Sequence, residues 1–366
     1  KKKGNRMEYK KALIITFSGI GDAVLTEVLC ENLKKMDKDI EIDFVVKNNA
    51  APLFTRNKAV TNVISYENDE RKNIFKYIAK IWSITRKKYD IILDIESTPR
   101  TELFSLFSLS SKFRIGKNKI SKHKVLGFKI TRGWFYTHKI TEDRKNNTVI
   151  ESIVKFLDPI VEDQKIKIQY TLDYKVDITE EEKLESKKIM ESVGIDFSKK
   201  IIMCGVNAVF EWKRWKREHM VNILKYIIDN YDYQLVLFYT PKEKDYTLEI
   251  AKELEQYSIN KKGKVFYNII TKNVRDLAKI IVNADMYFGN EGGTRHITQA
   301  LGKSSISICR KYDEKTRWIG EDKKHLALVI NDFVSIKEIE EKKLTWENMT
   351  SEMVISKLKM RLDSLK

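Results

Sequence analysis

The stretch Lys11–Lys35, KALIITFSGIGDAVLTEVLCENLKK, decides the fold of this chain. Its first part, Lys11–Phe17, is a short apolar run that predicts a buried strand, and the apolar spacing over about 22–35 predicts a helix. Gly19 and Gly21 fall between the two, where glycine lets the backbone turn tightly. A strand, a glycine turn and a helix in this order predict a parallel α/β sheet.

The same alternation continues through the first half of the chain and restarts in the second half. Further strands are expected at 40–46, 89–95, 113–115, 200–206, 234–239, 286–288 and 304–308. Helices are expected at 73–88, 99–108, 179–192, 217–229, 243–256, 274–283 and 294–301. Two such runs predict two Rossmann-like, doubly wound domains that face each other across a cleft.

The polar stretch before residue 180 gives the domain boundary. We expect an N-terminal domain at 1–178, a second domain at 179–345 and a C-terminal helix at 346–366. The pattern of that last helix is compatible with packing on either domain, and the N-terminal domain is a candidate surface for it. With 366 residues, of which 42% are hydrophobic, the chain can build two cores, and disorder of the whole chain is excluded.

The charge of the chain is strongly basic. The formal net charge is +17, and the stretch 112–145 holds 11 Lys or Arg against two acids. Such a field attracts nucleic acid, an anionic membrane surface, or a phosphorylated or carboxylated substrate. A lysine-rich composition of the whole chain explains the global charge equally well. No zinc-finger or RNP signature accompanies the cluster, but a nucleic-acid-binding protein is kept as an alternative.

Cysteine spacing and hydropathy indicate the compartment. The three cysteines form no CxxC pair, which argues against a disulfide scaffold or a thiolate zinc site and fits a reducing compartment. No apolar run reaches the roughly 18 residues that span a bilayer, and the first apolar stretch is too short for a signal peptide. We therefore expect a cytoplasmic protein.

The turn Ser18–Asp22 is the first segment that predicts chemistry. It follows a strand and opens a helix, whose N-terminus favours an anion. The dinucleotide fingerprint GxGxxG fails here because no glycine stands at its third position, and no GK[ST] follows to make a P-loop. Asp22 is either a carboxylate favoured by the helix dipole or a general base.

The segment Gly289–His296, GNEGGTRH, is the second and more informative one. It lies between an expected strand and an expected helix, so its Gly-Gly pair would expose several backbone N–H groups at the carboxyl end of a strand. That is a natural seat for a diphosphate. The alternative is a plain glycine turn with a histidine whose hydrogen bonds are satisfied.

The segment Trp212–Arg217, WKRWKR, places four cations and two tryptophans in six residues. Lysine suits phosphate as a point charge and arginine as a bidentate fork, so this segment predicts an anion site. A solvated helix start is the alternative. Asp37-Lys38-Asp39 has DxD spacing but precedes a strand, which disfavours a metal role, and the five histidines show no ligand spacing.

Together these segments resemble glycosyltransferase family 9, the ADP-heptose:lipopolysaccharide heptosyltransferases. Residues 13–22 are similar to the opening strand and S-x-x-G-D loop of that family. Residues 213–215 resemble its K-R-W-P segment, with lysine in place of the proline, and residues 284–303 resemble its A-D-x-x-x-G-N-D-S-G-x-x-H-x-x-x-A-L-G-K signature. Residues 94–96 and 114–116 resemble two weaker family segments, D-L-Q-G and R-I-G.

The resemblance implies a GT-B architecture with the acceptor on the N-terminal domain and the nucleotide sugar on the C-terminal one. It implies inverting transfer of a heptose, or a related sugar, from an ADP-sugar to a lipopolysaccharide inner-core acceptor, without a metal or other cofactor. The implied partners are this donor, an anionic glycolipid and, peripherally, the cytoplasmic face of the inner membrane. No nucleic acid is implied.

The resemblance also implies roles for single residues. Asp22 would be the general base, Lys213 would neutralise the donor diphosphate, and the backbone at 292–294 would bind it. The full set implied for the nucleotide sugar is Lys213, Arg214, Glu243, Glu291, Gly292, Gly293, Thr294 and His296. The set implied for the acceptor or its loop is Ser18, Gly19, Gly21 and Arg100.

Three departures from the family pattern leave the substrates open. Glu291 stands in place of Asp, and Gly292 in place of Ser or Thr, near the expected donor sugar. Glu96-Ser97 replaces Gln-Gly on the acceptor side. A non-catalytic relative that binds sugar nucleotides is therefore the second alternative.

Overall fold

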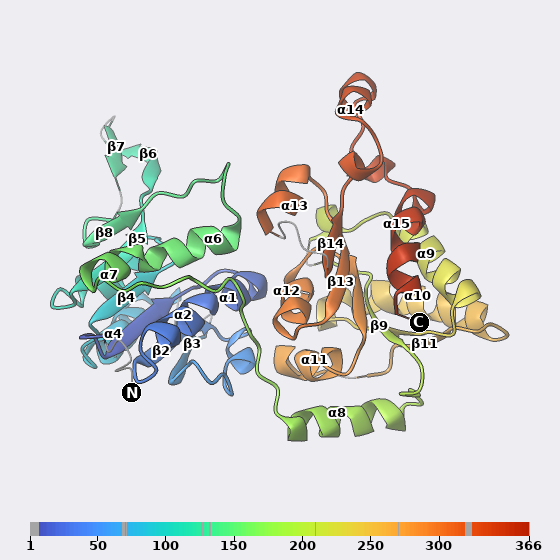
Figure 1. Cartoon of the computed structure of the whole chain (residues 1–366), viewed down its shortest axis with the longest axis horizontal. Coiled ribbons are helices and arrows are strands. Elements are labelled where there is room, and N and C mark those ends of the chain that lie inside the picture. The colour runs from blue at the N-terminus through green and yellow to red at the C-terminus, as the bar shows by residue number, and fades with distance from the viewer. Residues whose placement is uncertain are drawn as a thin grey trace. The chain divides into compact units, whose positions relative to one another are not determined.

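The computed structural model describes residues 7–365 apart from 68, 69, 71, 126, 127, 132, 209, 270 and 319–323. The chain divides into two compact units, Lys1–Asp177 and Ile178–Lys366 (Figure 1). The sequence placed this boundary between residues 178 and 179. Among the described residues, no helix is long and apolar enough to span a bilayer.

The N-terminal unit is built on a parallel sheet of six strands in the order β3-β2-β1-β4-β5-β8. Because β1 pairs with β2 on one side and with β4 on the other, the chain first builds toward one edge and then toward the other. The carboxyl ends of β1 and β4 therefore form the topological switch point, where α/β sheets bind ligands. The strands are β1 Lys11–Ile15, β2 Glu41–Lys47, β3 Asn62–Tyr66, β4 Ile91–Asp94, β5 Phe113–Lys117 and β8 His138–Ile140.

Helices α1 Ile20–Thr26 and α2 Val28–Met36 replace the single helix expected over 22–35. The remaining helices of this unit are α4 Ile74–Thr85, α5 Glu102–Leu106, α6 Val149–Val154 and α7 Asp158–Asp163. Tyr77 and Ile81 of α4 pack against Leu13 and Ile15 of β1, so one face of α4 closes the core over this sheet. Strands β6 Ile120–Val125 and β7 Phe128–Thr131 form a separate antiparallel pair. The side chains at 120–132, which belong to the basic cluster 112–145, lie outside those described.

The C-terminal unit repeats the same plan with the strand order β11-β10-β9-β12-β13-β14. Its strands are all parallel: β9 Ile201–Gly205, β10 Gln234–Leu237, β11 Lys264–Phe266, β12 Met286–Asn290, β13 Ser304–Ile308 and β14 His325–Leu328. Its helices are α8 Glu180–Ser192, α9 Arg217–Asn230, α10 Lys244–Ser258, α11 Val274–Ile281, α12 Gly293–Ala300, α13 Tyr312–Trp318, α14 Ile336–Lys342 and α15 Ser351–Asp363. The switch point of this sheet lies at the carboxyl ends of β9 and β12.

The C-terminal helix α15 packs on the C-terminal unit. Val354, Leu358 and Leu362 are buried in the same core as the apolar face of α9. The hydroxyl of Tyr233 donates a hydrogen bond to the carbonyl of Leu362 at 2.9 Å, which anchors the end of the helix. The apolar stripe of α15 thus covers the second sheet, whereas the sequence also offered the N-terminal domain as its packing surface.

Candidate active site

The first group of predicted site residues lies at the carboxyl end of β1. Gly19 precedes α1 in an extended conformation, and Asp22 lies in the first turn of that helix. The backbone N–H of Gly19 donates to Oδ2 of Asp22 at 3.1 Å, which satisfies one of the N–H groups left open at a helix start. Ser18 is partly exposed and Gly19 exposed, so the turn Ser18–Gly21 faces solvent at this edge.

Asp22 is half-buried, and burial raises its pKa above the usual value for aspartate. The Gly19 N–H opposes this shift, Glu96 adds to it through charge repulsion, and Lys117 and Lys47 lower the pKa. A carboxylate with a raised pKa holds a proton more readily, which is what a general base for a hydroxyl needs.

The end of β4 supports this turn. Oε1 of Glu96 accepts a hydrogen bond from the backbone N–H of Phe17 at 3.0 Å. It also lies 3.5 Å from the hydroxyl oxygen of Thr16. Glu96 therefore ties the turn after β4 to the turn that carries Asp22, although the family pattern has glutamine at its position.

A buried acid, Asp94, stands behind Glu96. The hydroxyl of Tyr136 donates to its Oδ2 at 2.6 Å, and the N–H groups of Glu96 and Ser97 donate to its Oδ1. Burial raises the pKa of Asp94 to about 6. The Tyr136 ring lies over Gly116, where a Cβ would come within 2.2 Å of it, so only glycine fits there.

Arg100 contributes its backbone to this edge. Its carbonyl accepts a hydrogen bond from the hydroxyl of Tyr77 at 3.1 Å, which joins the turn after β4 to α4. The side chain of Arg100 is exposed.

The second group lies at the carboxyl end of β12, where Asn290 organises the site. Asn290 is buried, and its Nδ2 donates to the carbonyls of Val206 and Asn207 at 3.0 and 3.4 Å. Its Oδ1 accepts from the backbone N–H of Trp215 at 3.0 Å. Since β12 neighbours β9, this one side chain fixes the loop after β9, which carries Lys213 and Arg214, beside the loop after β12.

The helix α12 begins directly after this loop, with Gly292 as the residue before its first turn. The N–H groups of a first helical turn have no partner within the helix, so residues Gly293 and Thr294 offer donors for an anion. The backbone of Gly292 is extended, and a Cβ built there meets nothing within 4 Å. Gly289 differs, because a Cβ there would lie 2.4 Å from the carbonyl oxygen of Gly205.

Glu291 is held by an arginine that the sequence interpretation did not single out. Arg295 is fully buried, and its Nε and Nη2 donate to the two carboxylate oxygens of Glu291 at 2.6 and 3.1 Å. Arg295 also donates to the side-chain oxygen of Gln299. Glu291 thus forms an ion pair with Arg295, four residues later in the chain, at the start of α12.

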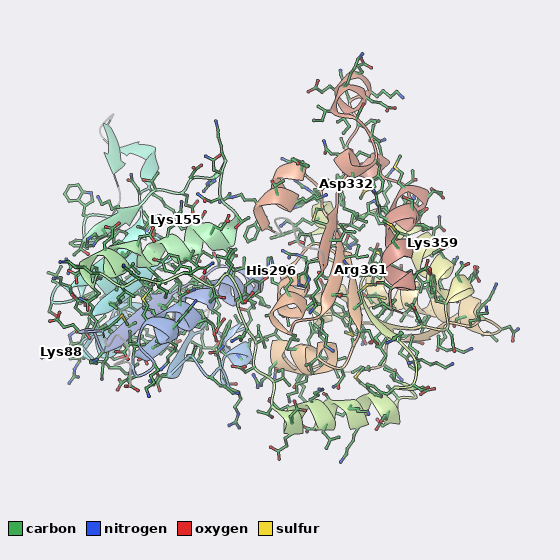
Figure 2. All side chains as sticks on the ribbon, viewed as in Figure 1. Lys88, Lys155, His296, Asp332, Lys359 and Arg361 are labelled. Carbon is green, nitrogen blue, oxygen red and sulfur yellow. The ribbon has the colours of Figure 1, made fainter. Side chains whose placement is uncertain are left out.

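His296, which is labelled in Figure 2, belongs to the same network. Its Nε2 lies 2.9 Å from Nη2 of Arg295 and 3.6 Å from Oε1 of Glu291. Burial and the neighbouring Arg295 hold the pKa of His296 well below its usual range, so the imidazole is neutral. Its ring packs edge-on against Trp318, with the centroids 5.7 Å apart. These contacts satisfy the imidazole within the C-terminal unit, as the alternative of a histidine with satisfied hydrogen bonds expects, and the role of His296 near the donor stays a prediction.

The cation segment is fixed by Trp215. This side chain is buried, and its indole N–H donates to the carbonyl of Met349 at 3.2 Å. Lys213 ends the short helix Glu211–Lys213 and is partly exposed, with its Nζ 5.2 Å from the Trp212 ring centroid. The guanidinium of Arg310, which follows β13, lies over the Trp212 ring, 4.4 Å from its centroid.

Arg214 and Glu243 differ in what they offer to a ligand. The guanidinium of Arg214 stacks on Tyr246 at 4.0 Å, and its buried Nε has no hydrogen-bond partner among the described residues. The carboxylate of Glu243 accepts from the N–H and hydroxyl of Thr240 at 2.9 and 2.7 Å, which caps its own turn. Asn207 donates to the carbonyl of Glu243 at 3.1 Å and so joins the ends of β9 and β10.

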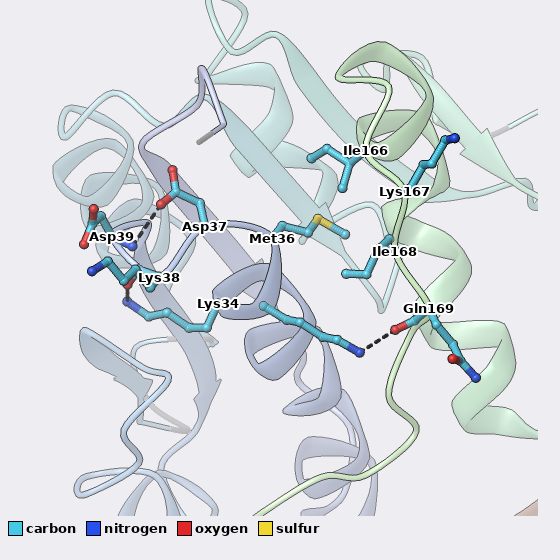
Figure 3. Close-up of a pocket in the computed structure, with 10 residues that line it drawn as sticks. Lys34, Met36, Asp37, Lys38, Asp39, Ile166, Lys167, Ile168 and Gln169 are labelled. Carbon is cyan, nitrogen blue, oxygen red and sulfur yellow. Dashed lines mark hydrogen bonds between the residues drawn. The ribbon is translucent and has the colours of Figure 1, made fainter. Parts of the chain in front are cut away.

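A hollow of about 640 Å³ in the N-terminal unit lies apart from these groups (Figure 3). It is lined by the end of α2, by Asp37–Asp39 and by Ile166–Gln169. Asp37–Asp39 directly precede β2, so the hollow lies near the amino end of that strand. Asp37 pairs with Lys10 at 3.3 Å, and no cluster of potential metal ligands is found in the described part of the chain.

The structure thus groups the predicted residues within each unit. In the N-terminal unit it brings Asp22 together with Glu96, and in the C-terminal unit it brings Lys213 and Arg214 beside the start of α12. Sequence reasoning missed Arg295, Arg310 and Tyr136 as parts of these sites. A charged residue within an otherwise buried helical face was the available signal for Arg295.

Comparisons with known proteins agree with this architecture. The model of glycosyltransferase family 9 (heptosyltransferase) matches residues 78–343. Lipopolysaccharide heptosyltransferase 1 of Campylobacter coli is 21% identical over 306 residues, which cover 81% of this chain and 83% of that protein.

Solved structures show the same fold. A glycosyltransferase family 9 protein of Veillonella parvula superposes with a TM-score of 0.74 at 18% identity, covering 97% of this chain and 98% of that one. ADP-heptose lps heptosyltransferase II of E. coli gives 0.72 at 17% identity, covering 96% and 98%. The E. coli heptosyltransferase WaaC with ADP-2-deoxy-2-fluoro heptose gives 0.62 at 16% identity, covering 91% and 100%. The two parallel sheets are those of the GT-B fold, and the chain belongs to glycosyltransferase family 9 and is a glycosyltransferase.

Proposed function

We propose that this protein transfers a heptose, or a related sugar, from an ADP-sugar to a lipopolysaccharide inner-core acceptor, with inversion at the anomeric carbon and without a metal ion. The observation that carries the proposal is the arrangement around Asn290. This side chain holds the cation loop with Lys213 beside the N-terminus of α12. Such a site matches a diphosphate, and a WaaC structure of this fold contains ADP.

The acceptor hydroxyl is assigned to the N-terminal unit. As its oxygen attacks the anomeric carbon of the donor, its proton passes to the carboxylate of Asp22. The raised pKa of Asp22 favours this step. Glu96, bonded to the backbone of Phe17, keeps the turn with Asp22 in place.

The leaving diphosphate is assigned to the C-terminal unit. The bond between the anomeric carbon and the diphosphate oxygen breaks, and ADP takes the electron pair of that bond. Lys213, the Nε–H of Arg214 and the N–H groups of Gly293 and Thr294 supply positive charge and donors for it. These groups support a reaction in which no metal ion neutralises the leaving group.

Glu291 is not assigned to the donor sugar directly. Because Arg295 binds both of its carboxylate oxygens, its carboxylate stabilises the loop rather than presenting an open acceptor. The open space beside Gly292 leaves room for a bulkier donor group than a serine at this position would allow. A related sugar therefore stays within the proposal next to heptose.

The partners follow from the same assignment. The acceptor is an anionic glycolipid, and the enzyme contacts the cytoplasmic face of the inner membrane peripherally while it acts.

The test is a transfer assay with ADP-heptose and a lipopolysaccharide inner-core acceptor in the presence of EDTA. We expect one sugar to be added, with the anomeric configuration opposite to that of the donor, as read by NMR of the product. A retained configuration would contradict the general-base mechanism. Donor hydrolysis without transfer to any inner-core acceptor would contradict the proposed acceptor.

A further inference from the structure

Helix α4 of the N-terminal unit carries an apolar side that does not face the core. Tyr77, Ile81 and Ile84 are buried against the sheet. Next to this buried face, Ile74 in the first turn is 46% exposed and Trp82 is 52% exposed. Residues four apart share one side of a helix, so Ile74, the partly buried Ile78 and Trp82 form one stripe.

Phe75 extends this stripe at the start of the helix. It is 81% exposed, although phenylalanine is among the residues that folding usually buries. The helix start is well formed, because the Asn73 side chain accepts hydrogen bonds from the N–H groups of Phe75 and Lys76 at 3.1 Å. The exposure of Phe75 therefore belongs to a regular helix rather than to a frayed end.

The apolar stripe is bordered by positive charge. Residues 72–88 contain six Lys or Arg and no Asp or Glu. Lys80 pairs with Glu70, and Lys87 pairs with Asp43. Lys76, Arg86 and Lys88 have exposed side chains, and Lys88 is labelled in Figure 2. The guanidinium of Arg86 lies 4.6 Å from the centroid of the Trp82 ring.

Exposed apolar residues continue on the neighbouring helix. α5 packs on α4, and Phe107 and Leu109 follow α5 with exposed side chains. The N–H groups of Gly133 and Phe135 each donate to Glu102 of α5 at 3.3 Å, which places the exposed Trp134 beside the same helix. We call the exposed apolar residues Ile74, Phe75, Trp82, Phe107, Leu109 and Trp134, with the cations of 72–88, the α4 surface.

We propose that the α4 surface docks on an anionic lipid membrane. A helix with Trp and Phe on one side and Lys and Arg next to them lies in the membrane interface, where the apolar side chains enter the acyl boundary. Tryptophan is favoured at the headgroup level, and each juxtamembrane cation gains from the negative surface potential.

The charge pattern distinguishes a membrane from a second copy of this chain. In a symmetric dimer the same patch meets itself, so the cations of one α4 would face those of the other. Like charges brought together across an interface oppose its formation. An anionic lipid surface has no such conflict, and it accepts both the aromatic stripe and the positive border.

Membrane docking does not depend on the transfer reaction, because the α4 surface includes neither Asp22 nor the residues assigned to the donor diphosphate. If the proposed function also holds, docking would bring a membrane-borne acceptor to the unit that carries Asp22.

The test is co-sedimentation of the whole chain with vesicles of phosphatidylcholine alone and of phosphatidylcholine mixed with phosphatidylglycerol. We expect binding to the mixed vesicles, weakened by salt, and little binding to phosphatidylcholine. Replacing Phe75→Ser and Trp82→Ser together removes two aromatic side chains from the interface and should weaken binding about tenfold or more. Lys76→Gln and Arg86→Gln should each weaken it about fivefold.

Matched controls come from the C-terminal unit. Ile336→Ser and Met360→Ser remove apolar side chains that are each 66% exposed, and we expect vesicle binding to be unchanged. Thermal unfolding of every variant checks that folding is intact. Failure of the parent chain to bind mixed vesicles, or equal binding by the Phe75/Trp82 variant, would overturn the proposal. A concentration-dependent dimer that this variant abolishes, without vesicle binding by the parent, would assign the surface to a second copy.

Discussion

The two sheets of this molecule have the same strand order but carry different residues after their two central strands. In the N-terminal unit the edge carries acids, with Asp22 after β1 and Asp94 and Glu96 at the end of β4. In the C-terminal unit the edge carries Lys213 and Arg214 after β9, and the N-terminus of α12 after β12. The fold thus supplies equivalent positions in both units, and the residues directly after the strands give each position its own chemistry.

The buried residues at equivalent strand ends show the same contrast. Asp94 ends β4 and Asn290 ends β12, and both accept hydrogen bonds from neighbouring loops. Asn290 also donates, so it holds carbonyl groups of the loop after β9 without adding negative charge there. Asp94 carries no such donor, and burial, with a smaller contribution from the charge of Glu96, raises its pKa to about 6.

The largest expected effect comes from removing Asp22, the proposed general base in the N-terminal unit. Asp22→Asn should lower kcat for transfer about 10²- to 10⁴-fold, because the acceptor hydroxyl then loses its proton acceptor. ADP binding, measured by calorimetry, should be unchanged and serves as the control for folding. Transfer within about tenfold of the parent rate would remove Asp22 from the catalytic role.

The next effect concerns stability on the other edge. Arg295→Met should lower the free energy of unfolding by about 3 kcal/mol, because Glu291 then loses its buried partner. Denaturant unfolding followed by circular dichroism measures this change. Glu291→Gln combined with Arg295→Met should restore part of the loss, since no unpaired charge remains. A single variant as stable as the parent would show that the pair does not organise the loop.

Substitutions in the loop after β9, which carries Lys213, should affect ADP binding more than folding. Lys213→Ala should weaken ADP binding about 10- to 100-fold, because a charge-assisted contact to phosphate contributes about 1.5–3 kcal/mol. The control is Lys216→Ala, three residues along the same cationic segment, whose side chain is exposed and for which we expect less than a threefold change. Equal effects of the two variants would indicate a diffuse charge effect instead of a bound diphosphate.

The pH dependence of transfer should reveal the groups that surround Asp22. The base acts without its proton, so kcat/KM should rise with pH through the raised pKa of Asp22. Glu96→Gln removes a negative charge that raises this pKa, and the profile should move to lower pH. Lys117→Gln removes a cation that lowers it, and the profile should move to higher pH. If both variants moved the pH profile in the same direction, Glu96 and Lys117 would not act on Asp22 as opposite charges.

The smallest effect is expected at a departure from the family pattern. Gly292→Ser should change ADP binding less than about threefold and stability by less than about 0.5 kcal/mol, because its Cβ has open space and its backbone is extended. Gly289→Ala is the matched contrast and should cost about 1–3 kcal/mol, since its Cβ would press on the Gly205 carbonyl. Thermal unfolding compares the two variants.

Much of the fold could be predicted from the sequence, because most of the central strands are apolar and alternate with stretches of helical periodicity. β1, β9 and β13 lie within the expected ranges, α9 differs from its range by one residue at its end, and α12 differs by one residue at each end. The outer strands β3, β8, β11 and β14 were not expected. They are short and mix polar with apolar residues, since an edge strand is buried less and its pattern is weaker.

The candidate site could be predicted only in part. The glycine turns and the cation segment gave Asp22, Lys213 and Gly292–Thr294 because they stand directly after strands or before helices. The supporting contacts join residues far apart in the chain, such as Tyr136 with Asp94 and Trp215 with Asn290. No local pattern predicts such pairs. The sequence placed Glu291 and His296 near the donor, which stays a prediction, but it did not indicate that both contact Arg295.

The central claim is that the C-terminal unit supplies a metal-independent site for ADP, and calorimetric titration of the whole chain tests it most directly. ADP, UDP, GDP and a short DNA duplex are titrated first with EDTA and then with Mg²⁺. We expect ADP to bind more tightly than UDP or GDP, and with the same affinity in EDTA and in Mg²⁺. Binding of ADP only with Mg²⁺, a preference for UDP or GDP, or binding of the DNA alone would contradict it.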